Sequence, residues 1–351
     1  MKKRAKVMNP ITIQLNHTLS EIFFCDFPKK LKDLIPEKNV FIITDTNLHL
    51  LYHHLLPDFP CFIISPGEKS KSFETCLSIY RWLLENHAQR DAFILGFGGG
   101  VVSDIAGFVA ATFMRGVALG IVSTSLLSQV DASVGGKNGI NFNSNKNIVG
   151  TFFQPKFVIC DIQLLETLPE DEYRNGMAEV VKHAILSGPP FFEFLEQNTS
   201  NINLRQPVAL DYIIRQSVQY KASIVSADEK EKHLRKILNL GHTVGHSIET
   251  TYGLPHGMAV SIGLAFASKL SVKLGLLDVN QQKRIENLLI KLNLPITFDI
   301  SHEKIVDKMV HDKKRFDNGI DFILIEAIGK VVIQRIPLVE LQKHLEQIIG
   351  Q

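Results

Sequence analysis

The chain has 351 residues, of which 45% are hydrophobic and 21% are charged, and its formal net charge at pH 7 is +2. This length and composition predict a soluble globular protein with enough core for two domains. The balanced charge argues against a nucleic-acid-binding surface.

The lack of a signal-peptide pattern and the spacing of the cysteines indicate a cytoplasmic protein. The basic start, residues 1–6, leads into no apolar run of the signal-peptide kind, and no apolar stretch reaches the length of a bilayer span. The four cysteines are far apart and form no Cys-x-x-Cys pair: Cys25, Cys61, Cys76 and Cys160. Buried free thiols in a reducing compartment are the expected result.

The first half of the chain alternates strand-like and helix-like segments. Residues 40–45 and 61–65 have the pattern of short buried strands, and apolar spacing predicts a helix over 72–87. A further strand is predicted at 91–96, running into a glycine cluster, before an apolar helix at 105–112. Such alternation is typical of a parallel sheet with helices on its faces.

The pattern changes near Leu168. Helices are predicted over 170–187, 207–226, 238–250, 256–275 and 280–292, with breakers such as Gly188-Pro189-Pro190 between them, and late strands near 322–325 and 331–333. We therefore expect an α/β domain over 1–168 and a mostly α-helical domain over 169–351. Ligands commonly bind in the cleft between two such domains.

Two histidines and a glutamate have the composition of a metal site. His242 and His246 are four residues apart, so on a helix both rings project from one face. With His256 downstream and Glu179 upstream, a carboxylate and two imidazoles suit zinc and leave one position for substrate or water. Taken alone, the histidine pair fits a solvated helix face equally well.

Glycines at 96–100 follow a predicted strand and precede a predicted helix, which suits a pyrophosphate at a helix N-terminus. The match to the dinucleotide-binding fingerprint is imperfect, because Val101 stands where a third glycine is expected. A tight turn is the alternative. Asp45, at a strand end, suits ribose hydroxyls, although a lone Asp in this position is more often a turn residue.

A second glycine-rich run, residues 131–139, places Lys137 among amides predicted to be exposed. Asn138 follows the lysine, so the run is not a P-loop. Lys137, with Lys146 and Asn147 nearby, suits an anionic or polyol substrate. The alternative is a solvated loop whose lysines are incidental.

Seven motifs in this order give the chain a resemblance to the 3-dehydroquinate synthase family over essentially its whole length: 66–71, 98–104, 114–116, 129–137, 177–182, 239–246 and 256–257. The resemblance implies a Rossmann-like N-terminal domain, an α-helical C-terminal domain, bound NAD, one divalent metal (zinc or cobalt) and a homodimer. It also implies a phosphorylated sugar acid as substrate. Neither nucleic acid nor a membrane is expected as a partner.

The implied reaction converts 3-deoxy-D-arabino-heptulosonate 7-phosphate into 3-dehydroquinate and phosphate, in the shikimate pathway. It proceeds by transient oxidation with NAD, β-elimination of phosphate, re-reduction and aldol closure. NAD is therefore not consumed.

The resemblance also assigns residues to each task. The metal ligands are Glu179, His242 and His256. The catalytic residues are His246, Lys182, Lys137, Arg115 and Asn147. Substrate contacts fall on Asp131, Lys146, Lys221, Arg235, Asn239 and one lysine of the pair Lys313-Lys314, for which we take Lys314. NAD contacts fall on Asp45, Asn47, Glu68, Lys71, Gly99, Gly100, Val101, Asp104, Thr124, Ser125, Lys137, Lys146 and Thr167.

Three of these roles make specific predictions. Lys182, three residues after Glu179 on a helix, points a cation toward the bound polyol. His246 is a hydrogen-bond donor or proton relay and not a ligand. Arg115 matches an arginine that reaches the substrate phosphate of the neighbouring subunit. The alternative for Arg115 is a cation that closes an apolar helix and interacts with the helix dipole.

The chain departs from the family pattern at a few positions. Ser123-Thr124-Ser125 stands where many members have Pro-Thr-Thr, Asn138 replaces a usual threonine, and Met258 replaces a usual glutamate. Rival functions are a sugar-phosphate cyclase of the inosose or valiolone synthase type, a metal-dependent polyol dehydrogenase, and a non-enzymatic binding protein. Asn239 and the Lys313-Lys314 pair favour dehydroquinate formation.

Overall fold

The computed structural model describes residues 9–15, 18–143, 145–298 and 319–349. The chain divides into two compact units: Met1–Leu168 with Lys221–Lys230, and Pro169–Tyr220 with Glu231–Gln351. Residues 221–230 cluster with the first unit, although the division predicted at residue 168 placed them in the second. This difference arises because one long helix, α7 (Pro207–Ala227), contributes residues to both units.

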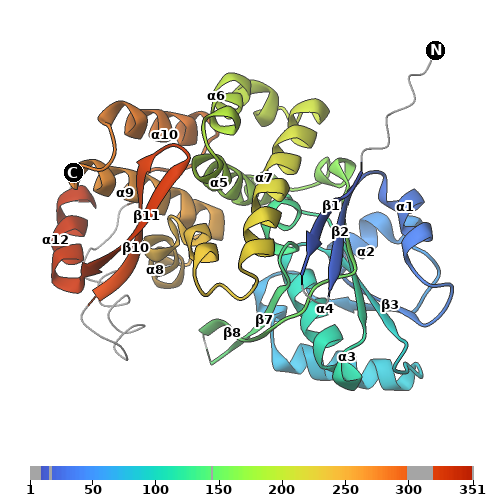
Figure 1. The fold of residues 1–351 in the computed structure, drawn as a ribbon. Coiled ribbons are helices and arrows are strands. Elements are labelled where there is room, and N and C mark those ends of the chain that lie inside the picture. The colour runs from blue at the N-terminus through green and yellow to red at the C-terminus, as the bar shows by residue number, and fades with distance from the viewer. Residues whose placement is uncertain (1–8, 16–17, 144, 299–318, 350–351) are drawn as a thin grey trace, which may run out of the picture. The chain divides into compact units, whose positions relative to one another are not determined.

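A seven-stranded sheet forms the centre of the first unit (Figure 1). Its spatial order is β1 (Ile11–Gln14), β2 (Leu19–Phe24), β9 (Phe157–Cys160), β6 (Ala118–Ser123), β5 (Phe93–Gly98), β3 (Val40–Asp45) and β4 (Cys61–Ile64). Every neighbouring pair is parallel except β1 and β2. The predicted parallel sheet is confirmed, and β5 is buried along its whole length, as expected for a central strand covered on both faces.

Four α-helices accompany this sheet: α1 (Phe27–Leu34), α2 (Thr46–Tyr52), α3 (Phe73–Glu85) and α4 (Gly100–Thr112). Short helical turns lie at η1 (His53–Leu55), η2 (Glu68–Ser70), η3 (Phe113–Arg115), η4 (Ser128–Ala132) and η5 (Ile162–Leu165). Ser72 caps α3 by accepting a hydrogen bond from the Thr75 N–H. Helix α4 packs on β3, β5 and β6 and begins directly at the glycine cluster.

The second glycine-rich run leads into a hairpin of β7 (Lys137–Phe142) and β8 (Asn145–Phe152), which packs on α4. The prediction that its amides are exposed is wrong for Val134, Gly135 and Gly136, which are buried. The close packing explains the burial, because a Cβ added to Gly107 of α4 would lie 1.7 Å from Asn138 Oδ1. Lys137 itself is exposed.

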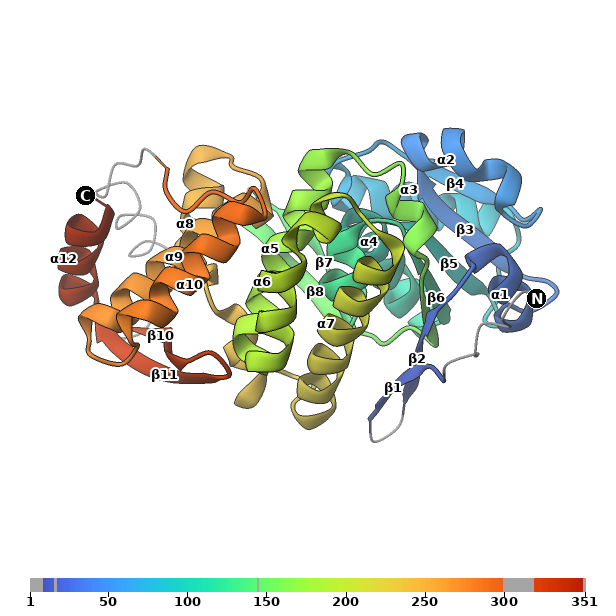
Figure 2. The same cartoon turned by 90° about the horizontal axis from the view of Figure 1, so that it is seen from above.

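The second unit contains most of the helices (Figure 2). Its elements are α5 (Glu170–Ser187), α6 (Pro189–Asn203), η6 (Leu234–Asn239), α8 (His242–Tyr252), α9 (His256–Lys273), α10 (Val279–Lys291), the antiparallel pair β10 (Gly319–Ala327) and β11 (Lys330–Pro337), and α12 (Leu338–Ile349). Helix α9 is its central element, packed against α5, α8, α10 and β10. The predicted α-helical character is confirmed.

Two details of this unit differ from the sequence prediction. Gly188-Pro189-Pro190 separates two helices as predicted, since α5 ends at Ser187, but the helix that follows, α6, was not predicted. It starts at Pro189, because Gly188 has a positive φ of 116° and the prolines occupy the first helical positions. The helix predicted over 238–250 begins only at His242, since Gly241 adopts a left-handed conformation with φ 79°.

Among the described residues, no helix is long and apolar enough to cross a membrane. All four cysteines are free; Cys76 and Cys160 are buried, whereas Cys25 and Cys61 are partly exposed. The expectation of burial is therefore wrong for two of them, and Cys61 is accessible because it begins β4, which lies at an edge of the sheet.

Candidate active site

Three side chains from three helices of the second unit converge on one point. Glu179 lies in the middle of α5, and His242 and His256 are the first residues of α8 and α9. Oε1 of Glu179 is 3.4 Å from His242 Nε2 and 3.3 Å from His256 Nε2. One ligand atom from each residue lies within 4.8 Å of the others. A carboxylate and two imidazoles at this spacing fit a zinc or cobalt ion.

Glycines bring α8 and α9 close enough for this convergence. A Cβ added to Gly263 of α9 would lie 1.9 Å from the Gly241 carbonyl oxygen, and one added to Gly245 would lie 3.0 Å from the Ala259 carbonyl oxygen. With both helices in this contact, the ring centroids of His242 and His256 are 5.4 Å apart.

We expect Gly263→Ala to lower the free energy of unfolding by about 1–3 kcal/mol, because the added methyl has to push backbone away. The ligands on α8 and α9 would separate, so metal affinity should fall as well. Thermal unfolding and metal titration measure both effects. Gly100→Ala is the matched control, since a Cβ on this helical glycine would only meet Ala132 Cβ at 3.5 Å. An equal melting temperature for Gly263→Ala and the unchanged protein would contradict the prediction.

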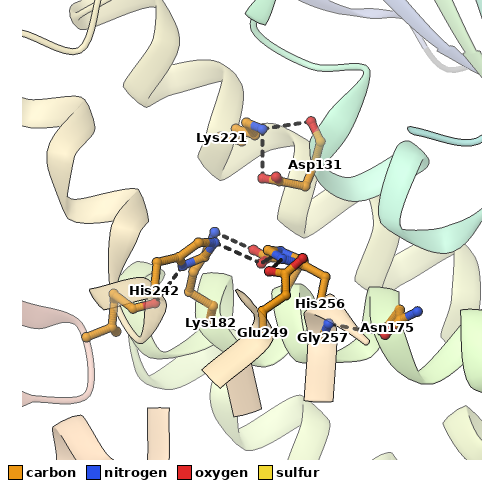
Figure 3. A network of polar contacts seen from close by, with 10 residues as sticks. Asp131, Asn175, Lys182, Lys221, His242, Glu249, His256 and Gly257 are labelled. Atoms are coloured by element: carbon orange, nitrogen blue, oxygen red, sulfur yellow. Dashed lines mark hydrogen bonds and ion pairs between the residues drawn. The ribbon is translucent and has the colours of Figure 1, made fainter. Parts of the chain in front are cut away.

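Both histidine rings are turned by a hydrogen bond at Nδ1. His242 Nδ1 lies 3.1 Å from the Leu240 carbonyl oxygen, and His256 Nδ1 lies 3.0 Å from Glu249 Oε2 (Figure 3). An acceptor at Nδ1 keeps the proton on that nitrogen and leaves Nε2 for a metal. The sequence analysis missed Glu249, whose only signal is its place on the predicted helix that carries His242 and His246.

The start of α9 is also fixed from α5. Asn175 Oδ1 accepts a hydrogen bond of 3.1 Å from the Gly257 N–H, next to His256 (Figure 3). Asn175 lies one helical turn before Glu179, so the same helix supplies one candidate ligand and holds the backbone beside another. The sequence analysis missed Asn175 too, because this contact depends on how α5 and α9 pack.

Buried charges balance one another around Glu179. Its carboxylate is fully buried and forms an ion pair with Lys182, whose side chain is 2% exposed. Burial alone would raise the pKa of Glu179, but the charge of Lys182 and the interactions with His242 and His256 hold the pKa well below its usual value. The predicted proximity of Lys182 to this site is thus present in the structure.

Each ring nitrogen of His256 faces a different carboxylate, Nδ1 that of Glu249 and Nε2 that of Glu179. Burial lowers the pKa of His256, but hydrogen bonds to Glu179 and Glu249 outweigh burial and raise the pKa to about 10. In the metal-free protein this ring is therefore protonated at neutral pH. Metal binding has to displace the proton from Nε2.

His246 lies one turn after His242, with its ring centroid 5.0 Å from that of His242 and 6.0 Å from that of His256. Its side chain is exposed. Its ring also forms a second group of potential ligands with Glu249 and His256. The role predicted for His246, a proton relay and not a ligand, stays a prediction.

The other predicted substrate residues of this unit lie just before α8. Arg235 is buried in η6, and Asn239 ends that turn, donating a hydrogen bond of 2.5 Å from Nδ2 to Glu231 Oε1. Lys313 and Lys314 lie outside the described residues.

In the first unit, several predicted NAD residues meet at Lys71. Its Nζ donates to Asp104 Oδ2 at 2.6 Å and to Asn147 Oδ1 at 2.5 Å, and lies 3.8 Å from Glu68 Oε1. Burial raises the pKa of Asp104 to about 6 although Lys71 opposes this shift. The structure thus brings together residues predicted to bind NAD and Asn147, which was predicted to be catalytic.

The glycine cluster starts α4 as predicted. Gly99 is the N-cap, Gly100 and Val101 follow in the first turn, and the Thr124 N–H donates to the Gly98 carbonyl oxygen at 3.1 Å. A Cβ on Gly99 would approach Ser125 Oγ to 3.2 Å. The helix N-terminus, the glycines and two hydroxyl-bearing residues therefore form one site that suits a pyrophosphate.

Lys221 and Asp131 form a second polar pair of this unit. Lys221 Nζ donates to both the backbone oxygen and Oδ1 of Asp131, at 2.7 Å each (Figure 3).

Other predicted residues have local roles or stand apart. Asp45 Oδ1 caps α2 by accepting from the Leu48 N–H at 3.0 Å, which is the turn role given above as the alternative. Thr167 Oγ1 is 2.6 Å from the Tyr52 hydroxyl at the end of α2. Asn47 lies exposed on α2, and Lys146 is exposed on β8. Their predicted contacts with NAD stay predictions.

Arg115 does not close the apolar helix as predicted. Helix α4 ends at Thr112, and Met114 and Arg115 have positive φ angles of 48° and 71°, which cannot continue a right-handed helix. Arg115 is exposed, and its side chain forms no hydrogen bond or ion pair within the described part of the chain.

Two departures from the family pattern have a structural explanation. Ser123 Oγ donates to Ser133 Oγ at 2.7 Å, in a buried group that also contains Ser128. Asn138 Nδ2 donates to the carbonyl oxygens of Gly136 and Phe153, at 2.8 and 2.9 Å, and so holds the β7–β8 hairpin together.

Solved structures similar to this chain include two sugar-phosphate cyclases that contain NAD+ and a divalent metal. A 2-deoxy-scyllo-inosose synthase, complexed with carbaglucose-6-phosphate, NAD+ and Co2+, is 25% identical with a TM-score of 0.85, covering 97% of this chain and 100% of its own. The 2-epi-5-epi-valiolone synthase of Streptomyces hygroscopicus, with NAD+ and Zn2+ bound, has the same identity and TM-score. The match covers 98% of this chain and 99% of the synthase. An iron-containing alcohol dehydrogenase of Corynebacterium glutamicum shares only the fold, at 13% identity and a TM-score of 0.64.

Sequence comparison gives the family. Residues 61–175 match the family model for the N-terminal part of 3-dehydroquinate synthase, and residues 176–315 match that for its C-terminal part. The 3-dehydroquinate synthase of Dehalococcoides mccartyi is 45% identical over 86% of this chain and 88% of its own length. The 3-dehydroquinate synthase of Thermoanaerobacter pseudethanolicus is 39% identical over 97% of this chain and 100% of its own length. The chain belongs to the 3-dehydroquinate synthase family.

Proposed function

We propose that this chain is a 3-dehydroquinate synthase that converts 3-deoxy-D-arabino-heptulosonate 7-phosphate into 3-dehydroquinate and phosphate. The observation that carries the proposal is the convergence of Glu179, His242 and His256 in a chain of this family. Incubating the purified protein with the heptulosonate phosphate and NAD, and assaying phosphate and dehydroquinate, tests it directly.

Glu179, His242 and His256 would hold a divalent metal ion, zinc or cobalt. The related cyclase structures contain Co2+ in one case and Zn2+ in the other. Such an ion supplies Lewis-acid stabilisation of a substrate alkoxide. Lys182 neutralises the buried charge of Glu179 and presents a cation to the polyol. His246, exposed beside the ligands, moves a proton at the substrate.

NAD would bind at the N-terminus of α4, where Gly99 and Gly100 leave room for its pyrophosphate. NAD supplies a hydride acceptor that later returns the hydride to the substrate. Glu68, Lys71 and Asp104 form the polar wall predicted to contact the nucleotide.

The substrate carries a phosphate and a carboxylate, so cationic side chains have to bind it. Lys137, Lys146, Lys221 and Arg235 supply these charges, and Arg235 offers two parallel donors to one anion.

The nearest rival is a cyclase that forms a different product from a similar substrate. The inosose and valiolone synthases are only 25% identical to this chain, whereas the dehydroquinate synthases reach 39–45%. Formation of dehydroquinate from the heptulosonate phosphate separates these possibilities. No product from it, together with turnover of a sugar phosphate that lacks the carboxylate, would favour the rival.

The net formation of NADH during turnover distinguishes a polyol dehydrogenase from a synthase. We expect turnover to require NAD, yet the absorbance of NADH should not rise, because each hydride removed from the substrate is returned to it. Recording absorbance at the NADH band alongside phosphate release measures this. NADH formed in proportion to product would place the chain among the dehydrogenases.

We further propose a cytoplasmic homodimer. Free thiols at all four cysteines support the reducing compartment. The exposed position of Arg115, with its polar atoms available to a second molecule, supports the dimer. Light scattering at several protein concentrations tests the assembly state.

A further inference from the structure

We propose that Glu249 is a positioning residue of the metal site, which fixes the ring of His256 so that Nε2 faces the metal. The inference rests on the proposed metal site and develops the contact between Glu249 and His256 Nδ1 into a specific role for Glu249. Glu249 lies in the last turn of α8, and it contacts His256, the first residue of the next helix, α9 (Figure 3).

The geometry of Glu249 and His256 supports a role for Glu249 in orienting the imidazole ring. Glu249 Oε2 lies 3.0 Å from His256 Nδ1, whereas Nε2 of the same ring is 3.3 Å from Glu179 Oε1. The two ring nitrogens therefore face two different carboxylates. An acceptor at Nδ1 settles which nitrogen keeps its proton, and the other nitrogen is then oriented toward the ligand set.

His242 provides an internal comparison. Its Nδ1 faces the carbonyl oxygen of Leu240, which belongs to the backbone immediately before α8. His256 begins α9 and has a side-chain acceptor from another helix in the equivalent role. A carboxylate makes the imidazole a stronger donor to a metal than a neutral carbonyl does. Glu249 therefore makes His256 a more basic metal ligand than His242, whose Nδ1 faces only a neutral carbonyl oxygen.

Local stability does not explain a glutamate at this position. Its side chain is 9% exposed, and burying a carboxylate is costly unless it is paired. It also lies in the last turn of α8, where a negative charge opposes the helix dipole. A residue that is unfavourable in both respects is expected where function requires it, and the hydrogen bond with His256 is one of the interactions that offset these costs.

Cobalt binding to the metal-free full-length protein tests the proposal without relying on turnover. We expect Glu249→Ala to weaken Co2+ binding by about 10- to 100-fold, the usual effect of removing a partner of a ligating histidine. Glu249→Gln should fall between Ala and the unchanged protein, because its amide oxygen still accepts a hydrogen bond but carries no charge. The visible Co2+ spectrum at saturation should keep its intensity, since all ligands remain.

Two control variants make the outcomes separable. Glu286→Gln removes another carboxylate of the same unit, 3.3 Å from Lys269 Nζ, and should leave the Co2+ affinity within about twofold, because it orients no ligand. His256→Ala tests the site itself and should abolish tight binding. If His256→Ala bound Co2+ normally, the proposed metal site would be wrong, and the role of Glu249 with it.

Other results would overturn the role of Glu249 alone. With His256→Ala impaired, normal Co2+ affinity in Glu249→Gln would show that the carboxylate only fills space; this variant keeps the native shape and serves even if Glu249→Ala does not fold. A changed saturated spectrum in Glu249→Gln would make Glu249 a direct ligand, in the group that it forms with His246 and His256. An equal loss in Glu286→Gln would indicate a general effect of charge.

Discussion

His242→Ala and His256→Ala are each expected to lose the bound metal and at least about 100-fold in kcat/KM. A Lewis-acid metal contributes several kcal/mol to catalysis, and each 1.4 kcal/mol or so corresponds to a factor of ten. Metal analysis of the purified variants and steady-state kinetics measure the two losses. In the unchanged protein, prolonged chelation should abolish activity, and zinc or cobalt should restore it.

His246→Ala is the matched control, because it removes an imidazole from the same helix one turn further on. Its ring is exposed and lies 5.0 Å from that of His242, so the variant should retain its metal but turn over slowly. An empty site in His246→Ala would reverse the roles of the two histidines of α8. Full activity in protein shown to be metal-free would remove the metal from the mechanism.

The sequence was most informative where a helix has clear boundaries. The segment predicted over 170–187 coincides with α5, and the start predicted at His256 coincides with that of α9. Since Glu179 and His256 lie on these helices, the elements that carry two of the proposed ligands could be predicted. Their convergence could not, because it depends on how closely Gly263 and Gly245 let α8 and α9 approach.

Packing and backbone conformation account for what the sequence did not reveal. Glu249 and Asn175 are unremarkable helix residues until α8, α9 and α5 are in contact. The β7–β8 hairpin owes its burial to its fit against Gly107 of α4. Arg115 looked like the end of a helix because composition carries no signal for its positive φ.

Arg115→Lys is expected to leave the melting temperature almost unchanged but to lower kcat/KM by about 10- to 100-fold. A charge-assisted hydrogen bond contributes about 1.5–3 kcal/mol, and lysine cannot reproduce the bidentate geometry of a guanidinium on a phosphate. The structure weakens the helix-dipole alternative, since α4 ends before Arg115 and φ at Arg115 is 71°.

The left-handed backbone of Arg115 permits a sharper comparison. Glycine adopts a positive φ without the steric cost that any other residue incurs, so Arg115→Gly should not lower the melting temperature. It should nevertheless lose more activity than Arg115→Lys. Arg81→Lys, at an exposed arginine of α3, is the control and should change neither quantity. Normal kcat/KM in Arg115→Gly would exclude the phosphate role.

Complementation between two strongly impaired variants locates Arg115 relative to the active site that it serves. The partner variant should be His246→Ala, because removing Lys182 would leave the buried Glu179 carboxylate without its cation. In a hybrid dimer of Arg115→Ala and His246→Ala, one composite site has every group intact if Arg115 acts across the twofold axis. Random exchange of equal amounts makes half of the dimers hybrid, so about a quarter of normal activity should return. If the arginine acts within its own subunit, each site of the hybrid lacks one group, and activity should stay absent even with subunit exchange confirmed.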